Sequence, residues 1–491
     1  MYLSKSKYCK CIQCNKILWL EKNKPEVGVY EDNSSVFDNG NKVGETAKGL
    51  FGKYEDVKFS ENLNDMIEET KELLKKDKCV ICEASFDYNG NFCSVDILKK
   101  NNNNYEIYEV KSSTEISDIY LDDISYQFYV LSSLGLNIKS ANIVYINNKY
   151  VRHKELELYK LFNIEDVTDI ALGKQEEVKK KIIDINKYME RKEEESKDID
   201  LYCFRPYECP FFKYCSSHIE ENNVFDIRGM SINKKIELYK KGHYDYASLL
   251  TENILDKYKE QIDFVLNNKE DKINIDEIKK FMNKLSYPLY FLDFETFQDS
   301  IPRFEGTSPY EQIPFQYSLH YLEKEGGELK HTEYLAEANI DPRRELAEKL
   351  INDIPKNTCV LAYNMSFEKN VIEKLSYLYP DLSDHLMNIH NNIKDLMIPF
   401  KNRDYYTKDM KGSYSIKYVL PALFPDDESL NYHNLEQVHK GDEASAAYLS
   451  LGNLSKHDQE VLRNNMLKYC SLDTYAMVKI YEKLKDKIKN N

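Results

Sequence analysis

The 491-residue chain is too long for a single hydrophobic core, so we expect two or three domains. Its 68 Lys and Arg and 83 Asp and Glu residues give a net charge of −15, which argues against binding a polyanion through bulk positive charge. No apolar run approaches the roughly 18 residues of a membrane span, and the first residues form no apolar signal core. We therefore expect a cytoplasmic protein with no membrane partner. Eleven cysteines in such a chain favour free thiols and metal ligands over disulfides.

The region before residue 96 predicts a packed segment, a helix and a strand. The residues after Cys14 are rich in apolar side chains and include the single Trp of the chain. Residues 62–76 have the spacing of an amphipathic helix, and residues 79–88 have the composition of a strand. Glu83 interrupts that strand. Because buried acids are uncommon unless they are paired or metal-bound, Glu83 is either a member of a functional cleft or an edge residue.

A hairpin is predicted over residues 96–111, where two segments of alternating apolar and polar residues flank an Asn-rich turn. In its second strand Glu109 and Lys111 project from one face, and strand pairing can bring Asp96 beside them. Two carboxylates and an ammonium in one cleft can hold a divalent cation, orient a water and neutralise charge on a phosphate. A solvated hairpin with an ion pair has the same residue pattern, so the choice between a metal site and a surface ion pair depends on the neighbouring motifs.

A helix with an apolar stripe is predicted from residue 123 onward. Gln127 lies where this helix can face the cleft, and its amide suits a phosphate or an attacking water; the alternative is a surface amide. Residues 141–150 predict a further strand. The strongly charged residues 165–196 predict a helical stretch with a solvated face.

Three cysteines close the N-terminal region. Cys203, Cys209 and Cys215 are spaced six residues apart, with a proline after the second. Thiolates on a compact loop without a His partner suit an iron-sulfur cluster or zinc, and both need a fourth ligand from elsewhere. We expect Cys14 to be that ligand. The alternative is a chance cluster of buried thiols.

The motifs of this region occur in a fixed order along the chain. An early cysteine (Cys14) is followed by an acid (Asp96), a Glu-Val-Lys triplet (Glu109 to Lys111), a Tyr-Gln pair (Tyr126 and Gln127) and three late cysteines (Cys203, Cys209 and Cys215). This order resembles the RecB-like branch of the PD-(D/E)XK nucleases, in which one early and three late cysteines bind a 4Fe-4S cluster. The resemblance implies a restriction-endonuclease-like domain over residues 1–218. In it Asp96 and Glu109 would ligate the metal, and Lys111 would activate or orient water. Gln127 would belong to an accessory motif, and the cluster would join the two ends of the domain.

Residues 219–285 predict small helical units with a break at Gly242. We expect a helical linker that fixes the spacing of two larger domains. A helical hairpin that grips backbone phosphates is the alternative.

The C-terminal region, residues 286–491, opens on a buried-type strand that ends in Asp293 and Glu295. Both carboxylates share one face, and neither belongs in an apolar core unless it binds something. Further strands are predicted over residues 312–322, 332–336 and 358–363.

Three later acids stand on the elements that follow. The strand at residues 358–363 leads into a helix that carries Glu368, and Asp395 is expected in a helical insertion. Near the end, Tyr469 and Asp473 are spaced i, i+4 on a helix, which places the hydroxyl and the carboxylate within reach of a shared water.

Three motifs follow one another here: a strand with Asp293-x-Glu295, a helix start with an Asn four residues before Glu368, and a helix with Tyr469 four residues before Asp473. This order resembles the Tyr-bearing subclass of the DnaQ-like exonucleases, which have the RNase H-like fold. The resemblance implies two divalent ions held by Asp293, Glu295 and Asp473. Tyr469 would orient the water for 3′ to 5′ cleavage. The second motif normally carries Asp, and here that position holds Glu368.

Together the motifs predict an α/β multidomain protein that resembles bacterial fusions of a RecB-like iron-sulfur nuclease with a DnaQ-like exonuclease. The expected function is metal-dependent hydrolysis of DNA at two sites, with single-stranded ends as the favoured substrate. The expected cofactors are Mg²⁺ or Mn²⁺ and a 4Fe-4S cluster. Two alternatives stay open: a catalytically weakened scaffold that binds nucleic acid, which Glu368 and the acidic charge favour, and an RNA-processing exonuclease.

Overall fold

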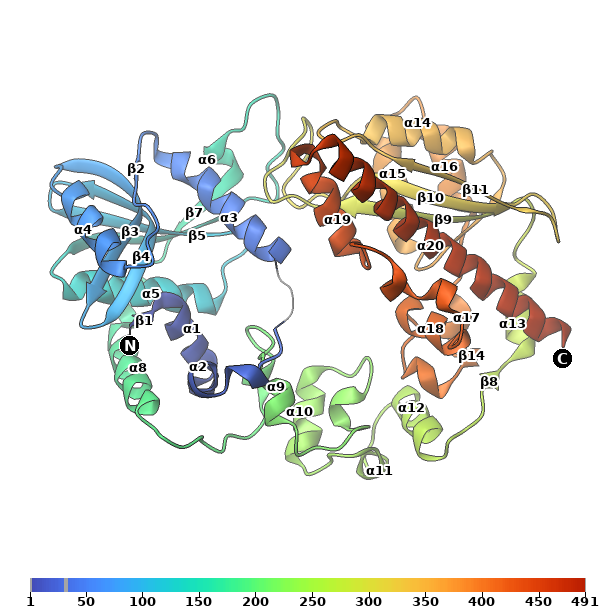
Figure 1. Ribbon diagram of the computed structural model, residues 1–491, viewed down its shortest axis with the longest axis horizontal. Coiled ribbons are helices and arrows are strands. Elements are labelled where there is room, and N and C mark those ends of the chain that lie inside the picture. Colours follow the sequence, from blue (N-terminus) through green and yellow to red (C-terminus); the bar gives the residue numbers. More distant parts are fainter. Residues whose placement is uncertain (1, 31–33, 491) are drawn as a thin grey trace. The chain divides into compact units, whose positions relative to one another are not determined.

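The computed structural model describes residues 2–30 and 34–490, and Figure 1 shows their course. The chain is an α/β protein with two compact units, each built on its own sheet, which confirms the expected α/β multidomain class. Unit 1 comprises Met1–Glu220 and Asp299–Tyr310, and unit 2 comprises Glu221–Gln298 and Glu311–Asn491. Within the described residues, we find no helix with the length and apolar character that crossing a membrane requires.

Unit 1 contains a mixed seven-stranded sheet with the order β2-β3-β4-β5-β6-β7, and β1 pairs with β4. The neighbours β3, β4 and β5 are antiparallel, whereas β5 and β6 are parallel. The strands are β1 (Leu3–Ser4), β2 (Glu55–Asp56), β3 (Lys78–Tyr88), β4 (Asn91–Asn101), β5 (Asn104–Lys111), β6 (Asn137–Ile146) and β7 (Phe162–Asp166). The expected hairpin is therefore β4 and β5.

Helices cover both faces of this sheet. They are α1 (Lys5–Gln13), α2 (Asn15–Asn23), α3 (Ser34–Lys48), α4 (Leu63–Leu73), α5 (Asp118–Ser133), α6 (Leu158–Leu161), α7 (Thr168–Gly173), α8 (Gln175–Met189) and α9 (Phe212–Cys215). Alternation along the strands separates two cores: Ile81 and Ile107 pack with α5, whereas Cys82 and Tyr108 pack with α3. The charged helix α8 is solvated on one side only, because Ile182 and Ile185 join the α5 core.

Unit 2 contains a five-stranded sheet with the order β11-β10-β9-β12-β13. The strands β9, β10 and β11 are antiparallel, and β12 and β13 continue the sheet in parallel with β9. The strands are β9 (Leu289–Phe297), β10 (Ile313–Leu322), β11 (Leu329–Leu335), β12 (Cys359–Ala362) and β13 (Ile393–Asp395), and a separate pair consists of β8 (Lys272–Ile273) and β14 (Tyr405–Tyr406). Asp395 thus ends a strand, and the expected helical position is wrong.

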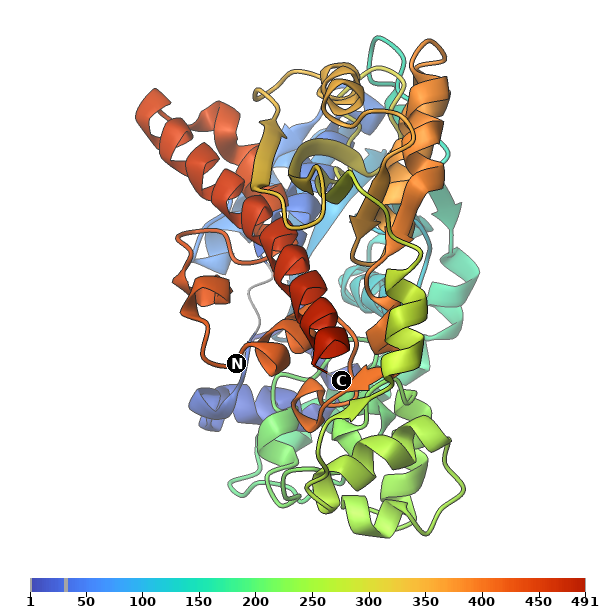
Figure 2. The ribbon, with the colours of Figure 1, turned by 90° about the vertical axis from the view of Figure 1, so that its right-hand side faces the viewer.

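Helices pack on both faces of the second sheet, and Figure 2 shows the long α20 crossing it. The helices of unit 2 are α10 (Ile232–Lys240), α11 (Tyr246–Leu249), α12 (Asp256–Leu266), α13 (Ile275–Met282), α14 (Arg343–Asp353), α15 (Ser366–Leu378), α16 (Ser383–Asn392), α17 (Ile398–Lys401), α18 (Ile416–Leu423), α19 (Gly441–Ser450) and α20 (Lys456–Lys489). Leu292 and Phe294 of β9 pack with α14, α15 and α16, whereas Phe291 packs with α13, α18 and α20. Period 2 therefore turns Asp293 and Glu295 toward the α20 face.

The expected linker, residues 219–285, belongs to the C-terminal unit from Glu221 onward. Phe264 of α12 packs against Tyr406, and β8 pairs with β14. Gln261 donates to the Asp226 carbonyl and the Tyr246 hydroxyl, which ties the small helices together. These contacts make the segment part of a folded core and not a spacer.

The connection between β9 and β10 belongs partly to unit 1. Asp299 pairs with Lys42, and Arg152 Nη1 donates to the carbonyl oxygens of Pro302 and Arg303 at 2.8 and 3.0 Å. Ile301 is buried in the core beneath α3. The chain therefore leaves β9, contributes a short segment to unit 1, and returns to β10.

Candidate functional site

Asp96 and Glu109 meet where β4 and β5 separate. The ladder between these strands ends with Ile97 opposite Tyr108, so the next residues, Asp96 and Glu109, face each other without ladder hydrogen bonds. Asp96 Oδ2 instead accepts a hydrogen bond from the Val110 backbone N–H at 2.7 Å. Because the ladder ends here, the Val110 N–H is available to hold the Asp96 carboxylate in place.

Lys111 and Gln127 complete this cluster with an acid from α5. Lys111 Nζ donates to Glu109 Oε1 and to Asp123 Oδ2, both at 2.7 Å. Gln127 Nε2 donates to Glu109 Oε2 at 2.6 Å and to Asp123 Oδ1 at 3.1 Å. Because Gln127 is fully buried, the alternative of a surface amide is wrong. All four predicted residues of the first site come together.

Lys5, at the start of α1, occupies the centre of the same cluster. Its Nζ lies 3.0 Å from Asp96 Oδ1 and 3.0 Å from Glu109 Oε1. Burial opposes the ammonium charge, but the carboxylates of Asp96 and Glu109 outweigh it and hold the pKa of Lys5 well above its usual value. The cluster therefore contains three carboxylates and two ammonium groups.

Two acids of unit 1, Asp123 in the cluster and Glu83 beside it, have perturbed pKa values. Burial and the neighbouring Glu109 carboxylate raise the pKa of Asp123. Burial and the Asp96 carboxylate raise the pKa of Glu83 to about 7. Glu83 has a positive φ of 57° and interrupts the β3–β4 ladder opposite Asp96. Its charge therefore acts on the cleft, although no hydrogen bond joins it to the cluster.

The four predicted cysteines line one pocket. Cys14, at the start of α2, and the trio Cys203, Cys209 and Cys215 surround it together with Lys16. All are free thiols. Burial, with a contribution from the neighbouring thiols, raises the pKa of Cys203 to about 11 and that of Cys209 to about 12. The pocket joins the N-terminal helices to the last segment of the unit.

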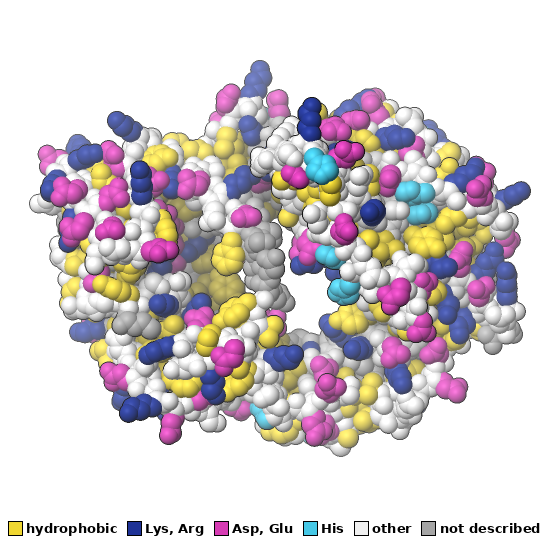
Figure 3. Space-filling model, viewed as in Figure 1, with side chains coloured by type: hydrophobic (Ala, Val, Ile, Leu, Met, Phe, Trp, Pro, Cys, Tyr) yellow, Lys and Arg dark blue, Asp and Glu magenta, His cyan; other side chains and the backbone are white. Residues whose placement is uncertain are grey.

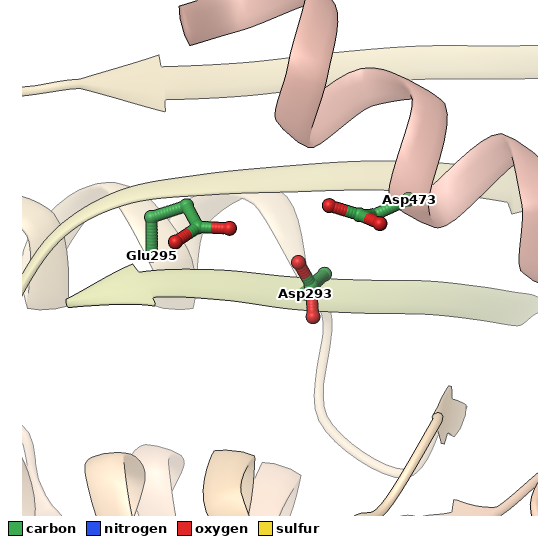
Figure 4. Close-up of side chains that lie close together, drawn as sticks. All are labelled: Asp293, Glu295 and Asp473. Carbon is green, nitrogen blue, oxygen red and sulfur yellow. The ribbon is translucent and has the colours of Figure 1, made fainter. Parts of the chain in front are cut away.

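The second site lies between β9 and α20. Asp293 and Glu295 project from β9 toward Asp473 on α20, as Figure 4 shows. One oxygen of each carboxylate lies within 4.8 Å of the others. Among the His, Cys, Asp and Glu side chains of residues 2–30 and 34–490, this is the one group of three or more that meets this spacing.

The three carboxylates of the second site repel one another. Burial and the Asp473 charge raise the pKa values of Asp293 and Glu295 well above their usual range. Burial raises the pKa of Asp473 to about 6, although hydrogen bonds from Tyr432 and Tyr469 favour its ionised form. Across the described part of the chain, none of the three carboxylates forms an ion pair with a Lys, Arg or His side chain. These carboxyl groups therefore keep their protons to higher pH than isolated ones do.

Two tyrosines flank Asp473. The Tyr432 hydroxyl donates to Asp473 Oδ1 at 2.6 Å, and the Tyr432 and Tyr469 rings lie 6.0 Å apart. Burial and the Asp473 charge raise the pKa of Tyr469, so its hydroxyl stays protonated and can donate. Tyr469 thus stands where the sequence predicts it, one turn before Asp473.

Glu368 is buried in the first turn of α15 but lies outside the three-carboxylate group. Its Oε2 finds no hydrogen-bond partner among the described residues, and burial, together with the Asp395 charge, raises its pKa to about 8. The charge of Glu368 acts on Asp293. Asp395 Oδ1 is occupied by the backbone N–H groups of Asn364 and Met397, both at 3.0 Å, so it serves as a cap at the end of β13.

Sequence reasoning missed Lys5, Asp123 and Tyr432. The i, i+4 spacing of Asp123 and Gln127 on one helix face is a signal that points to Asp123. Lys5 is far from the hairpin in sequence and has no motif around it. Tyr432 lies in a short turn, and the chain has 39 tyrosines, so no local pattern distinguishes it.

Comparisons with known proteins give similarity without a functional assignment. Residues 290–415 match a family described as a domain of unknown function, DUF2779. The chain is also similar to an uncharacterized protein of Mycoplasma genitalium, with 26% identity over 404 residues that cover 74% of this chain. The chain spans 59% of that relative's length. No solved structure matches the chain.

Proposed function

We propose that the protein is a metal-dependent nuclease with two active sites, one in each unit, that hydrolyses phosphodiester bonds of DNA. The observation that carries the proposal is the group formed by Asp293, Glu295 and Asp473, whose oxygens lie within 4.8 Å of one another. Three carboxylates this close together, without an ion-pair partner among the described residues, are costly to ionise, and divalent cations that prefer oxygen ligands offset that cost. Mg²⁺ or Mn²⁺ bound here would supply Lewis acidity and charge neutralisation for phosphate chemistry.

The topology of unit 2 supports a DnaQ-like exonuclease of the RNase H-like fold. Three antiparallel strands followed by two parallel ones give the order β11-β10-β9-β12-β13, with the first strand at the centre. Asp293 and Glu295 lie on that central strand, and Asp473 lies on the last helix. Tyr469 can hold a water beside Asp473, because its hydroxyl is protonated.

The hairpin cluster of unit 1 supports a PD-(D/E)XK nuclease of the RecB-like type. Asp96 and Glu109 adjoin each other at the end of a ladder, and Lys111 lies 2.7 Å from Glu109. In this role the two carboxylates would hold a divalent cation, and Lys111 would orient water or neutralise charge on the phosphate. Gln127 holds Glu109 in place from α5.

The cysteine pocket fits a 4Fe-4S cluster better than a single zinc ion. Four thiols converge on it, which is the ligand number that either group requires. Zn–S bonds of about 2.3 Å would bring the sulfurs to roughly 4 Å from one another. Across the described chain, no three cysteine sulfurs lie within 4.8 Å of one another, so the spacing favours the larger cluster. A colourless preparation with stoichiometric zinc would contradict this assignment.

A scaffold that binds nucleic acid without cutting is the second candidate. It is favoured by Lys5, which already neutralises Asp96 and Glu109, and by Glu368, which lies apart from the three-carboxylate group. Manganese titration followed by electron paramagnetic resonance separates the two functions. The nuclease requires tight binding at both sites. Asp473→Asn should remove the binding that belongs to the second site, and the control Asp486→Asn, on the exposed side of α20, should leave it unchanged. Absence of manganese binding in the unsubstituted protein favours the scaffold.

The substrate class is tested by measuring how fast anaerobically purified protein cleaves labelled DNA and labelled RNA of the same sequence. We expect faster cleavage of DNA, in both Mg²⁺ and Mn²⁺. Preferential cleavage of RNA would instead assign an RNA-processing exonuclease, because only a 2′-hydroxyl distinguishes the two backbones.

A further inference from the structure

One tyrosine that no nuclease motif supplies is bonded directly to a candidate metal ligand of unit 2. The Tyr432 hydroxyl donates to Asp473 Oδ1 at 2.6 Å, within the usual range for a hydroxyl that donates to a carboxylate. Tyr469 lies on α20 together with Asp473, whereas Tyr432 reaches Asp473 from a separate segment. The two tyrosine rings meet edge to face with their centres 6.0 Å apart. Asp473 is therefore held from outside its own helix.

The backbone around Tyr432 is fixed by its neighbours in the chain. Tyr432 opens the short 3-10 turn Tyr432–Asn434, and the Asn431 side chain accepts a hydrogen bond from the His433 N–H at 3.0 Å. Leu430 is buried in the core between the sheet and α20. A side chain on a fixed backbone loses little entropy when it holds a partner. The Tyr432 hydroxyl is therefore suited to fix the rotation of the carboxylate that it contacts.

The segment that begins at Tyr432 also passes the other end of the acidic group. It leads into α19 at Gly441, where a Cβ would lie 3.4 Å from Glu295 Oε2, so the backbone runs close to that carboxylate. Tyr448 of α19 stacks on Phe315 of β10 with ring centres 4.2 Å apart, which holds α19 against the sheet. The segment therefore borders two of the three carboxylates that Figure 4 shows.

We propose that Tyr432 is a positioning residue of the second site, which holds Asp473 in the orientation that a bound metal ion requires. The inference rests on the proposed nuclease function of unit 2. Hydrogen-bond partners of a metal-binding carboxylate fix its rotation, and their loss commonly costs about ten- to a hundred-fold in metal affinity. The two tyrosines then have different roles, because Tyr432 acts on metal affinity and Tyr469 acts on the attacking water.

The test is Mn²⁺ binding to the second site, measured by electron paramagnetic resonance with Glu109→Gln present to silence the first site. Tyr432→Phe removes only the hydroxyl and keeps the packing of the ring. It should raise the Kd for Mn²⁺ at least about ten-fold, because the carboxylate of Asp473 is then free to rotate. Tyr469→Phe should leave this Kd unchanged, because its hydroxyl acts on the water.

The matched control is Tyr317→Phe. The Tyr317 hydroxyl donates to Asp353 Oδ2 at 2.7 Å, and its buried ring packs with Phe294 on the opposite face of the same sheet. Tyr432→Phe and Tyr317→Phe each remove one hydrogen bond from a tyrosine to an aspartate, so both should lower the melting temperature. Only Tyr432→Phe should change the binding of Mn²⁺.

Cleavage of single-stranded DNA separates positioning from a general loss of structure. In the same Glu109→Gln background, Tyr432→Phe should need about ten-fold more Mn²⁺ for half-maximal cleavage and should reach the parent's rate when Mn²⁺ is saturating. Tyr469→Phe should lower the saturated rate and keep the Mn²⁺ midpoint. A merely structural role for Tyr432 would instead lower the saturated rate of Tyr432→Phe and leave its midpoint in place.

Two outcomes overturn the role of Tyr432: an unchanged Kd for Mn²⁺ in Tyr432→Phe, and an equal rise of that Kd in Tyr317→Phe. If the Glu109→Gln protein binds no Mn²⁺, the proposed function of unit 2 fails together with this role. If it binds Mn²⁺ and Tyr432→Phe binds it equally well, the positioning role alone fails.

Discussion

At the scale of single residues, the two carboxylate clusters differ in how their charge is balanced. In unit 1, Lys5 and Lys111 lie within 3.0 Å of acidic oxygens and satisfy most of the negative charge. In unit 2, Asp293, Glu295 and Asp473 adjoin one another without an ion pair in the described chain. To bind a metal as we propose, the first cluster would have to exchange a lysine contact for it, whereas the second would only have to lose protons.

Asp473→Asn should stabilise the metal-free protein while abolishing activity at the second site. The folded pKa of Asp473, about 6, lies above that of an unfolded aspartate, so its ionised form costs stability above that pH. Removing that charge should raise the free energy of unfolding by roughly 3 kcal/mol at pH 8. Chemical denaturation in EDTA measures the change. A loss of stability in Asp473→Asn, with Asp486→Asn unchanged, would contradict the account.

Glu368 should make the stability of the metal-free protein fall as the pH rises. Its folded pKa, about 8, is above the usual value of 4.5, so folding favours the protonated acid, and that contribution is lost as pH rises from about 4.5 through 8. Glu368→Gln should flatten this part of the pH profile of the melting temperature. Glu373→Gln, on the same helix, is the control. An identical slope in the Glu368→Gln variant rejects the assignment.

Lys5→Met should tighten metal binding at the first site. The Lys5 ammonium occupies space between Asp96 and Glu109 that a cation bound to both would need. Without that competitor, the apparent Kd for Mn²⁺ should fall about ten-fold, which corresponds to about 1.4 kcal/mol. Calorimetric titration with Asp473→Asn present isolates this site, and Lys10→Met on the same helix is the control. Unchanged or weaker binding would show that Lys5 supports the metal instead.

At the scale of elements, the sequence indicates most strands but not their ends. The apolar alternation of β4 and β5 and the apolar run of β9 predict these strands, and period 2 then fixes which face Asp96, Glu109 and Asp293 occupy. The β3–β4 ladder is interrupted at Glu83, opposite Asp96, next to the point where β4 and β5 separate. The local secondary-structure propensity of these residues does not predict this interruption. Asp395 was expected in a helix because β13 has three residues, too few for a periodic signal.

Contacts between distant elements are where sequence reasoning fails. Lys5 reaches Glu109 across 104 residues, and Tyr432 reaches Asp473 across 41. Neither pair has a spacing rule, since tertiary packing alone brings the elements together. The sequence predicts that Cys14 joins the late cysteines because thiols have a chemistry that requires partners, and all four line one pocket.

The cysteine pocket should act as a clamp between the ends of unit 1. Cys209→Ser should lower the iron content and the melting temperature of anaerobically purified protein by several degrees, because one ligand of four is lost. Cys79→Ser, a half-buried thiol on β3, should change neither quantity. Iron analysis and calorimetry provide the measurements. Full retention of iron and stability in Cys209→Ser would exclude a structural cluster at this pocket.

At the scale of the whole molecule, each unit carries its own sheet and its own acidic site. Figure 3 shows acidic and basic side chains interspersed over the visible surface, in keeping with the net charge of −15. Nucleic acid would therefore be bound by local groups such as Lys111 and not by a broad basic face. The chain passes from unit 2 to unit 1 and back through Asp299–Tyr310, and no sequence motif predicts this connection.

We propose that the chain has two separate phosphodiesterase sites, one in each unit. The most direct measurement is cleavage of end-labelled single-stranded DNA by four proteins: unsubstituted, Glu109→Gln, Asp473→Asn and the double variant, with Glu106→Gln and Asp486→Asn as controls. Each single variant should lose one component of the product pattern, and the double variant should leave the DNA intact. Uncut DNA with the unsubstituted protein in both Mg²⁺ and Mn²⁺, or full cleavage by the double variant, would contradict the claim.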